Sequence, residues 1–435
     1  MSKDKFAKIL DSEKFILLMV FSACVYAAFK DSWRLFADIF QTSLLLVSLL
    51  AIIVKWDFFK KERILWLLPI AIIVQLFSWW HSLLFYQEFA SPTPQLGRLV
   101  ELFMFFFFSF WLRGNKKYIT FFLICFMIGS VFTLNYHSPL IPEIWIGLSG
   151  IRVDFDYRNA QHGSLIIGAS VLITAFFFMT EISKRKVRKI NILLLFFHLL
   201  FLILILFLLQ TRQSFIGIIL AMTITILAWS INRKESKKTL ISISVITLII
   251  ITLSFINNNV IFERINSELY ILTDYLLKGN FSNIPHTSFG VRLQLWYESF
   301  SWFNKSPFIG YGNKVEVHMI EKSHYLPNYI TSEFKHVHSS YIATLLRFGI
   351  FGLILALTIL VIPVVEAFNL CSKHQHTKNI QYLALMFLVF WLVVNTFESF
   401  WYMKAGLWTY TVFMAAIYTI PLSNRYKNYQ ASLKS

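Results

Sequence analysis

The sequence predicts an all-α polytopic membrane protein with about twelve transmembrane helices. Hydrophobic residues make up 57% of the 435 residues and charged residues only 14%, against about 25% charged in an ordinary soluble domain. This chain has too little charge to cover the surface of a soluble enzyme of its size. It is also too hydrophobic for a disordered protein. Both classes are therefore excluded.

The first elements are the membrane spans. A helix needs roughly 17–25 mainly apolar residues to cross a bilayer. Twelve stretches qualify, near 14–29, 35–54, 64–86, 96–112, 117–134, 164–181, 190–209, 214–231, 239–256, 340–366, 379–397 and 405–421. Each is expected to be helical, because lipid offers no partner for backbone N–H and C=O groups.

The connections between these spans alternate in charge. Lys and Arg exceed Asp and Glu by 40 − 23 = 17, and the excess falls in the N-terminus, the C-terminus and every second connection. The basic connections lie near 55–63, 113–117, 184–189, 233–238 and 373–378. Cytoplasmic loops of membrane proteins are enriched in Lys and Arg. The pattern therefore places both termini in the cytoplasm and does not require a nucleic-acid partner.

Two connections on the other side are long, at about 135–163 and 257–338. The second has apolar residues at helical spacing over 260–277 and again at Leu293, Trp296, Phe300 and Phe303, which predicts amphipathic helices along the outer membrane face. A turn signal at 306–312 ends the latter helix. We expect spans one to nine in 1–256, a helical periplasmic loop domain in 257–338, and spans ten to twelve with a cytoplasmic tail in 339–435.

Two arginines stand out on this outer side. Arg212 interrupts two apolar runs with almost no loop between them, which predicts a tight helical hairpin at the membrane edge. Arg292 falls near the start of the amphipathic helix, where a helix N-terminus and a guanidinium together suit a phosphate. The alternatives are an interfacial arginine extended toward lipid headgroups and a solvated arginine.

Histidines precede the tenth span. His336 and His338 can titrate near neutral pH, and either can serve as a general base; the alternative is an interfacial histidine. A metal site is a further alternative, in which they join His318, His324, Glu321 and Glu333. That spacing fits no familiar ligand pattern, so we predict no metal.

The earlier outer loop carries a mixed polar and aromatic strip. It contains Arg152, Arg158, Asn159, Gln161 and His162, with Trp145 and Tyr157. This strip suits a headgroup or a sugar, and it equally suits an ordinary interfacial loop. Taken together, the outer arginines and histidine favour a phosphorylated lipid, because a departing diphosphate needs positive charge where its negative charge develops.

Three motifs in this sequence resemble those of one known protein family. His338-Ser339 is followed by nine residues and then Gly349-Ile350-Phe351-Gly352. Arg292 is followed by Trp296, Pro307, Gly310 and Gly312, and Arg212 lies within Thr-Arg-Gln-Ser. In these motifs and in its twelve-span plan, the chain resembles the O-antigen ligase family. That family shares its signature with O-antigen polymerases and protein O-oligosaccharyltransferases.

The resemblance implies a glycosyltransferase-C-like fold and an enzyme at the periplasmic face of the bacterial inner membrane. Such an enzyme transfers a glycan en bloc from undecaprenyl diphosphate to lipid A–core, with inversion and with neither metal nor other cofactor. Arg212 and Arg292 would hold the diphosphate, and His338 would deprotonate the acceptor hydroxyl. Further substrate contacts are expected from Arg152, Arg158, Gln161 and His336.

A ligase is the function that we expect first, and two alternatives remain open. A polymerase shares the donor and the fold, and Leu353 stands where ligases often carry threonine after the second glycine. A transporter of lipid-linked sugars would need ionisable residues near the bilayer midplane. The spans hold few of these; His81 and His198 are examples, and Glu366 and Glu398 lie near span ends.

Overall fold

The computed structural model describes residues 3–184, 186–232, 284, 286–370 and 375–433. Helices are the only regular elements in these ranges, so the all-α class is confirmed for them. Within these ranges, nine helices are long and apolar enough to cross a membrane. They are α3 Arg34–Val54, α5 Arg63–Phe85, α8 Lys116–His137, α10 Ala160–Ile182, α11 Lys189–Leu209, α12 Arg212–Asn232, α18 Ser340–Phe368, α19 Gln375–Phe397 and α20 Lys404–Ser432.

The other three predicted spans have different outcomes. The first corresponds to α2 Glu13–Phe29, a helix of 17 residues. The stretch near 96–112 is broken into α6 Gly97–Val100, the 3-10 helix η1 Glu101–Phe103 and α7 Met104–Leu112. The stretch near 239–256 lies outside the described residues. The count of twelve and the glycosyltransferase-C-like fold therefore stay predictions.

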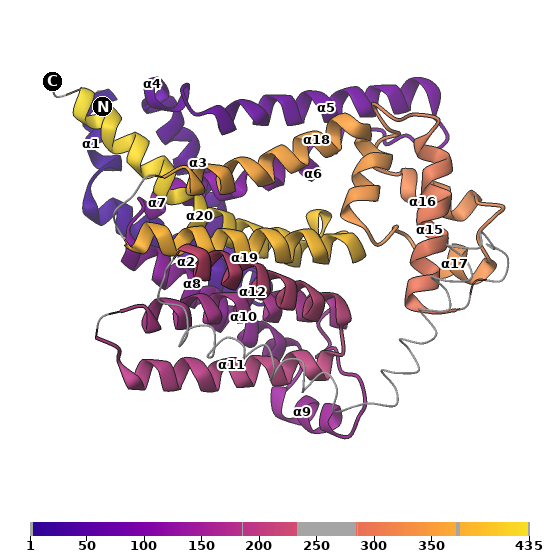
Figure 1. The fold of residues 1–435 in the computed structure, drawn as a ribbon. Helices are drawn as coiled ribbons and strands as arrows, with labels where there is room; N and C mark the ends of the chain where they lie inside the picture. The colour runs from indigo at the N-terminus through magenta and orange to yellow at the C-terminus, as the bar shows by residue number, and fades with distance from the viewer. Residues whose placement is uncertain (1–2, 185, 233–283, 285, 371–374, 434–435) are drawn as a thin grey trace.

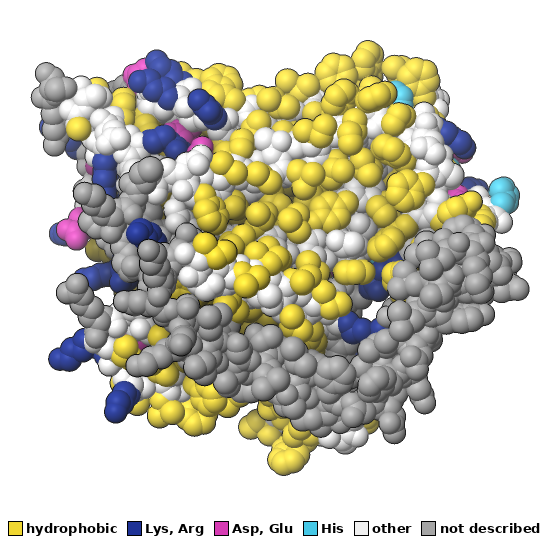
Figure 2. Space-filling view, in the orientation of Figure 1, with side chains coloured by type: hydrophobic (Ala, Val, Ile, Leu, Met, Phe, Trp, Pro, Cys, Tyr) yellow, Lys and Arg dark blue, Asp and Glu magenta, His cyan; other side chains and the backbone are white. Residues whose placement is uncertain are grey.

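Burial separates inner from outer helices. In the most apolar part of each helix, the share of buried residues is 94% for α20 and 83% for α10. The same share is only 22% for α3 and 22% for α5. Outward positions of α3 are large and apolar, among them Leu35 and Ile39. Figure 2 shows hydrophobic side chains across the middle of the visible face. An apolar surface of this extent is expected for helices that face lipid.

Both termini lie at one end of the bundle (Figure 1). There, Asp11 accepts hydrogen bonds from Lys55 Nζ at 2.5 Å, from Arg113 Nη2 at 2.9 Å and from the Tyr426 hydroxyl at 2.9 Å. These contacts tie two of the basic connections to both chain ends, and Lys and Arg are frequent along this edge in Figure 2. Termini at one end require an even number of crossings. The cytoplasmic location of this end stays a prediction.

Shorter helices occupy the opposite end. They are α9 Leu140–Leu148 from the first long connection, and α15 Ser288–Phe303, α16 Val315–Lys322 and α17 Asn328–Glu333 from the second. Figure 1 shows α15 running across the direction of the membrane-length helices. The helix predicted around 293–303 is thus confirmed, whereas the one predicted over 260–277 lies outside the described residues. The remaining short helices are α1 Lys3–Leu10, α4 Trp56–Phe59 and the 3-10 helix η3 Phe400–Tyr402.

Candidate functional site

A cavity of about 270 Å³ opens where the first turns of α10, α12 and α15 meet. This is the end of the bundle opposite the termini (Figure 1). Four of the residues singled out by the sequence line it, namely Arg152, Gln161, Arg212 and Arg292. Among its described lining residues three are arginines and none is a carboxylate. The cavity therefore favours an anionic ligand.

The turn between α11 and α12 positions Arg212. Gln210 ends α11 in a left-handed conformation, with φ of 49°, and α12 begins only two residues later, at Arg212. The Ser214 hydroxyl donates to Ser164 Oγ at 2.8 Å and so fixes the first turn of α12 against α10. The tight hairpin expected from the sequence is present, and Arg212 lies half-buried at its tip.

The first turn of α15 positions Arg292. Thr287 caps this helix, since its side chain accepts from Gly290 N–H at 3.0 Å. Arg292 Nη1 donates to the Ser288 carbonyl at 3.2 Å. Ser288 and Phe289, the first residues of α15, also line the cavity. An anion there would meet both a guanidinium and the positive end of a helix dipole.

The two histidines flank Val337 in one turn, and hydrogen bonds of Val337 hold that turn in place. The backbone N–H of Val337 donates to Glu316 Oε2 at 3.0 Å, and its carbonyl accepts from Trp296 Nε1 at 2.9 Å. Glu316 is itself held by Arg347, whose Nη2 lies 2.6 Å from Oε1. His338 follows with φ of 50°, a left-handed conformation. Such a conformation is uncommon for residues other than glycine, so this firmly bonded turn determines where the imidazole points.

The glycine motif after the histidines has a structural role. Gly349 interrupts α18 with φ of 62° and ψ of −163°. The turn at 306–312 packs into this break, and Ile350 N–H donates to the Pro307 carbonyl at 2.8 Å. A Cβ atom at Gly349 would lie 2.2 Å from the carbonyl carbon of Phe308. Only glycine combines this conformation with so close an approach.

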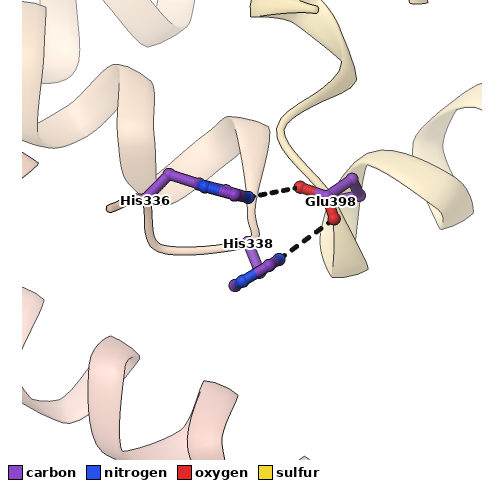
Figure 3. A group of neighbouring side chains, drawn as sticks. All are labelled: His336, His338 and Glu398. Carbon is purple, nitrogen blue, oxygen red and sulfur yellow. Dashed lines mark hydrogen bonds and ion pairs between the residues drawn. The ribbon is translucent and has the colours of Figure 1, made fainter. Parts of the chain in front are cut away.

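Both histidines contact one carboxylate, that of Glu398 directly after α19 (Figure 3). His336 Nε2 lies 3.1 Å from Glu398 Oε1, and His338 Nδ1 lies 3.0 Å from Oε2. Ser399 N–H also donates to Oε1 at 2.9 Å. The Glu398 side chain is fully buried. A carboxylate in such surroundings must be compensated by hydrogen bonds from its neighbours.

The pKa shifts within this group follow from its contacts. Burial favours the neutral form of Glu398, but the hydrogen bonds from both histidines outweigh it and hold the pKa of the carboxyl far below its usual range. Burial also opposes protonation of His336, yet the hydrogen bond and charge of Glu398 raise its pKa. For His338 burial wins, and its pKa is lowered. These directions describe an ionised Glu398 beside a neutral His338.

Gln161, at the start of α10, joins the carboxylate to the cavity. Its amide matches its neighbours when the NH₂ group faces Glu398 Oε2 and the carbonyl faces Arg292. Arg292 Nη2 then donates to that carbonyl at 2.8 Å. A chain of contacts thus runs from Arg292 through Gln161 and Glu398 to His338. This chain of contacts joins three of the residues that the sequence singled out, Arg292, Gln161 and His338, and adds Glu398.

Two other predicted contacts have different surroundings. Arg152 lines the cavity and its Nε donates to the Leu209 carbonyl at 3.3 Å. Arg158 does not line the cavity; its Nη2 lies 2.6 Å from Oδ1 of the buried Asp31. Asp31 also accepts from the Tyr157 hydroxyl. The structure therefore places Arg158 in an ion pair with a buried carboxylate, apart from the other candidates.

A metal-ligating group can be drawn from the same side chains. In the described part of the chain, the ligand atoms of His336, His338 and Glu398 lie within 4.8 Å of one another. The other members of the metal alternative have different partners, since His318 lies 3.4 Å from Glu88 and Glu321 lies 2.7 Å from Lys335. Direct hydrogen bonds join both histidines to Glu398. We therefore treat the three side chains as a hydrogen-bonded group.

Glu398 is the residue that sequence reasoning missed. In the sequence it is only an ionisable residue near the end of a predicted span. Its one signal in the sequence is an acidic residue in 397–402 between two apolar stretches, at the end of the bundle predicted to hold the arginines. Nothing in that local pattern indicates that it meets the histidines, which lie 60 and 62 residues earlier.

A comparison with protein families bears on these residues. Residues 197–357 match the family model described as O-antigen ligase. The resemblance predicted from the sequence motifs is thereby confirmed over this region. The matched region includes Arg212, Arg292 and His338, whereas Gln161 and Glu398 lie outside it. The match supports a membrane glycosyltransferase-like enzyme of ligase or polymerase type with lipid-linked glycan substrates. No curated protein matches the chain.

Proposed function

We propose that the chain is an O-antigen ligase of the bacterial inner membrane. In this proposal it transfers an O-polysaccharide en bloc from undecaprenyl diphosphate to a hydroxyl of lipid A–core, at the periplasmic face and without a metal ion. One observation carries the proposal: Arg212 and Arg292 line an anion-favouring cavity, and Gln161 and Glu398 connect that cavity to His338.

The chemistry is a single displacement at the anomeric carbon of the donor. The diphosphate lies between Arg212 and Arg292, whose guanidinium groups present paired donors to phosphate oxygens. His338 Nε2 takes the proton of the acceptor hydroxyl. The acceptor oxygen then bonds to the anomeric carbon, while the bond from that carbon to the phosphate oxygen breaks. The electron pair leaves with the lipid diphosphate, and the configuration inverts.

The arginines supply the larger part of the proposed rate enhancement. Negative charge grows on the bridging phosphate oxygen as the glycosidic bond breaks. Fixed positive groups placed at such a position stabilise the transition state more than the ground state, because the charge they face is still developing. Arg212 and Arg292 come from different helices, α12 and α15, so the two can face the diphosphate from different sides.

The test is deletion of the gene followed by gel analysis of the lipopolysaccharide. The proposed ligase predicts bare lipid A–core, with lipid-linked polymer accumulating in the membrane. A polymerase would instead leave the core capped with a single unit, and an unchanged ladder would reject both. Complementation by wild type, and not by Arg292→Ala or His338→Ala, would connect the phenotype to this cavity.

A further inference from the structure

Four hydrogen-bond donors converge on the carboxylate of Glu398. They are His336 Nε2, His338 Nδ1, the backbone N–H of Ser399 and the amide NH₂ of Gln161. An ionised carboxylate only accepts hydrogen bonds, and it has about four lone-pair positions. All four are therefore engaged. Each of the two imidazoles has to present an N–H group to this carboxylate.

This requirement fixes the tautomer of His338. A proton held on Nδ1 by Glu398 leaves Nε2 of the neutral ring with its lone pair. Nε2 is buried and has no hydrogen-bond partner among the described residues. In Figure 3 this second ring nitrogen points away from the carboxylate. A buried nitrogen without a partner is costly, and a substrate hydroxyl is the kind of group that would satisfy it.

We infer that Glu398 is a positioning residue that assigns different tasks to the two histidines. It holds the Nδ1–H tautomer of His338, so that Nε2 is free to accept a proton from the acceptor hydroxyl. It also binds Nε2 of His336, which leaves that imidazole as a donor to the carboxylate and not as the base. The inference rests on the proposed function, and it adds a residue outside the region that matches the family model.

The geometry accounts for this division between the histidines. Their ring centroids lie 4.0 Å apart, so two imidazolium groups side by side would repel each other. Glu398, His336 and Arg292 are the charged or titratable groups that act on His338. Burial opposes protonation of both rings, but Glu398 raises the pKa of His336 whereas the pKa of His338 is lowered, so His336 is protonated more readily than His338. During transfer His336 is neutral, the proton from the acceptor reaches Nε2 of His338, and Glu398 stabilises the resulting imidazolium until that proton is released.

Glu398→Gln tests the inference in the full-length protein reconstituted in lipid nanodiscs. An amide replaces one acceptor oxygen by an NH₂ group, so at least one of the four converging donors would face another donor. We expect kcat to fall by about 10²–10⁴-fold, the usual contribution of a general base, with a much smaller change in KM for the lipid-linked donor. Glu366→Gln is the matched control, because it neutralises a carboxylate of α18 that pairs with Arg425 instead.

A second measurement uses the wild-type protein and does not depend on the variant folding. Nitrogen-15 NMR of labelled histidines, assigned by the signal lost in His338→Gln, should show a neutral His338 protonated at Nδ1. A proton on Nε2 would overturn the inference. So would full turnover of a folded Glu398→Gln protein, or a divalent ion held stoichiometrically by wild type and lost from that variant. Wild type that transfers no glycan refutes the proposed function instead, and so does an active His338→Ala.

Discussion

Arg292→Ala removes one of the two guanidinium groups assigned to the donor diphosphate. The side chain is half-buried in the cavity wall, with α15 beginning beside it. A unit charge about 4 Å from a phosphate oxygen contributes about 4 kcal/mol at the effective dielectric constant of about 20 found near protein surfaces. Loss of that interaction in the transition state corresponds to a fall in kcat of about 10³-fold.

The assay is transfer of glycan from a lipid-linked donor by protein purified in lipid nanodiscs. Arg34→Ala is the control, because Arg34 is a half-exposed arginine that pairs with Asp38 at 3.5 Å and does not line the cavity. It should keep wild-type kcat. Size-exclusion and thermal unfolding profiles establish that each variant is folded.

Arg212→Ala should cause a comparable loss, and the double variant should lose less than the sum of the two. Non-additivity is expected because both groups act on the same leaving group. The reasoning is refuted if folded Arg212→Ala and Arg292→Ala each retain turnover close to that of wild type. It is equally refuted if Arg34→Ala is as impaired as they are.

Four further predictions follow from the described residues. Arg158→Ala should lower the free energy of unfolding by about 1–3 kcal/mol, because it strands the buried Asp31 carboxylate; chemical denaturation measures this, and unchanged stability contradicts it. Gly349→Ala should destabilise the protein by at least about 1–3 kcal/mol, because its left-handed backbone is strained for alanine; a wild-type melting temperature would count against this. Burial lowers the pKa of His338, and this residue acts as a base only when neutral. In the pH profile of kcat/KM, the fall on the acidic side should therefore occur at a pH below the ordinary pKa of histidine; a fall at a higher pH argues against His338 as the base. Chelators should leave transfer by the purified protein unchanged; inhibition reversed by one divalent ion would restore the metal alternative.

The fold was predictable where the length and hydrophobicity of a stretch are enough to identify a membrane span. Stretches such as 190–209 and 214–231 are each apolar over the length of a full membrane crossing. Only four residues separate them, so Arg212 has no position except near a helix end. The stretch near 96–112 was harder. It has the apolar content of a span, but its phenylalanines pack against α20, with Phe105 and Tyr410 in contact. Hydrophobicity does not distinguish lipid from a protein interior as the environment of such a stretch.

The site was predictable only in part, for a related reason. Arg212, Arg292 and His338 each stand out against the residues beside them in the chain. Glu398 and Gln161 gain their roles from contacts across helices, and no local pattern encodes these. Arg158 shows the opposite case, since it has the appearance of a substrate contact in the sequence but pairs with Asp31, 127 residues away.

The most direct measurement is a cryo-electron microscopy structure of the protein in nanodiscs with undecaprenyl diphosphate. The account predicts the diphosphate within hydrogen-bonding distance of Arg212 and Arg292, on the side of the membrane opposite both termini. A lipid diphosphate bound at the end that holds the termini, or one that contacts neither arginine, would contradict it.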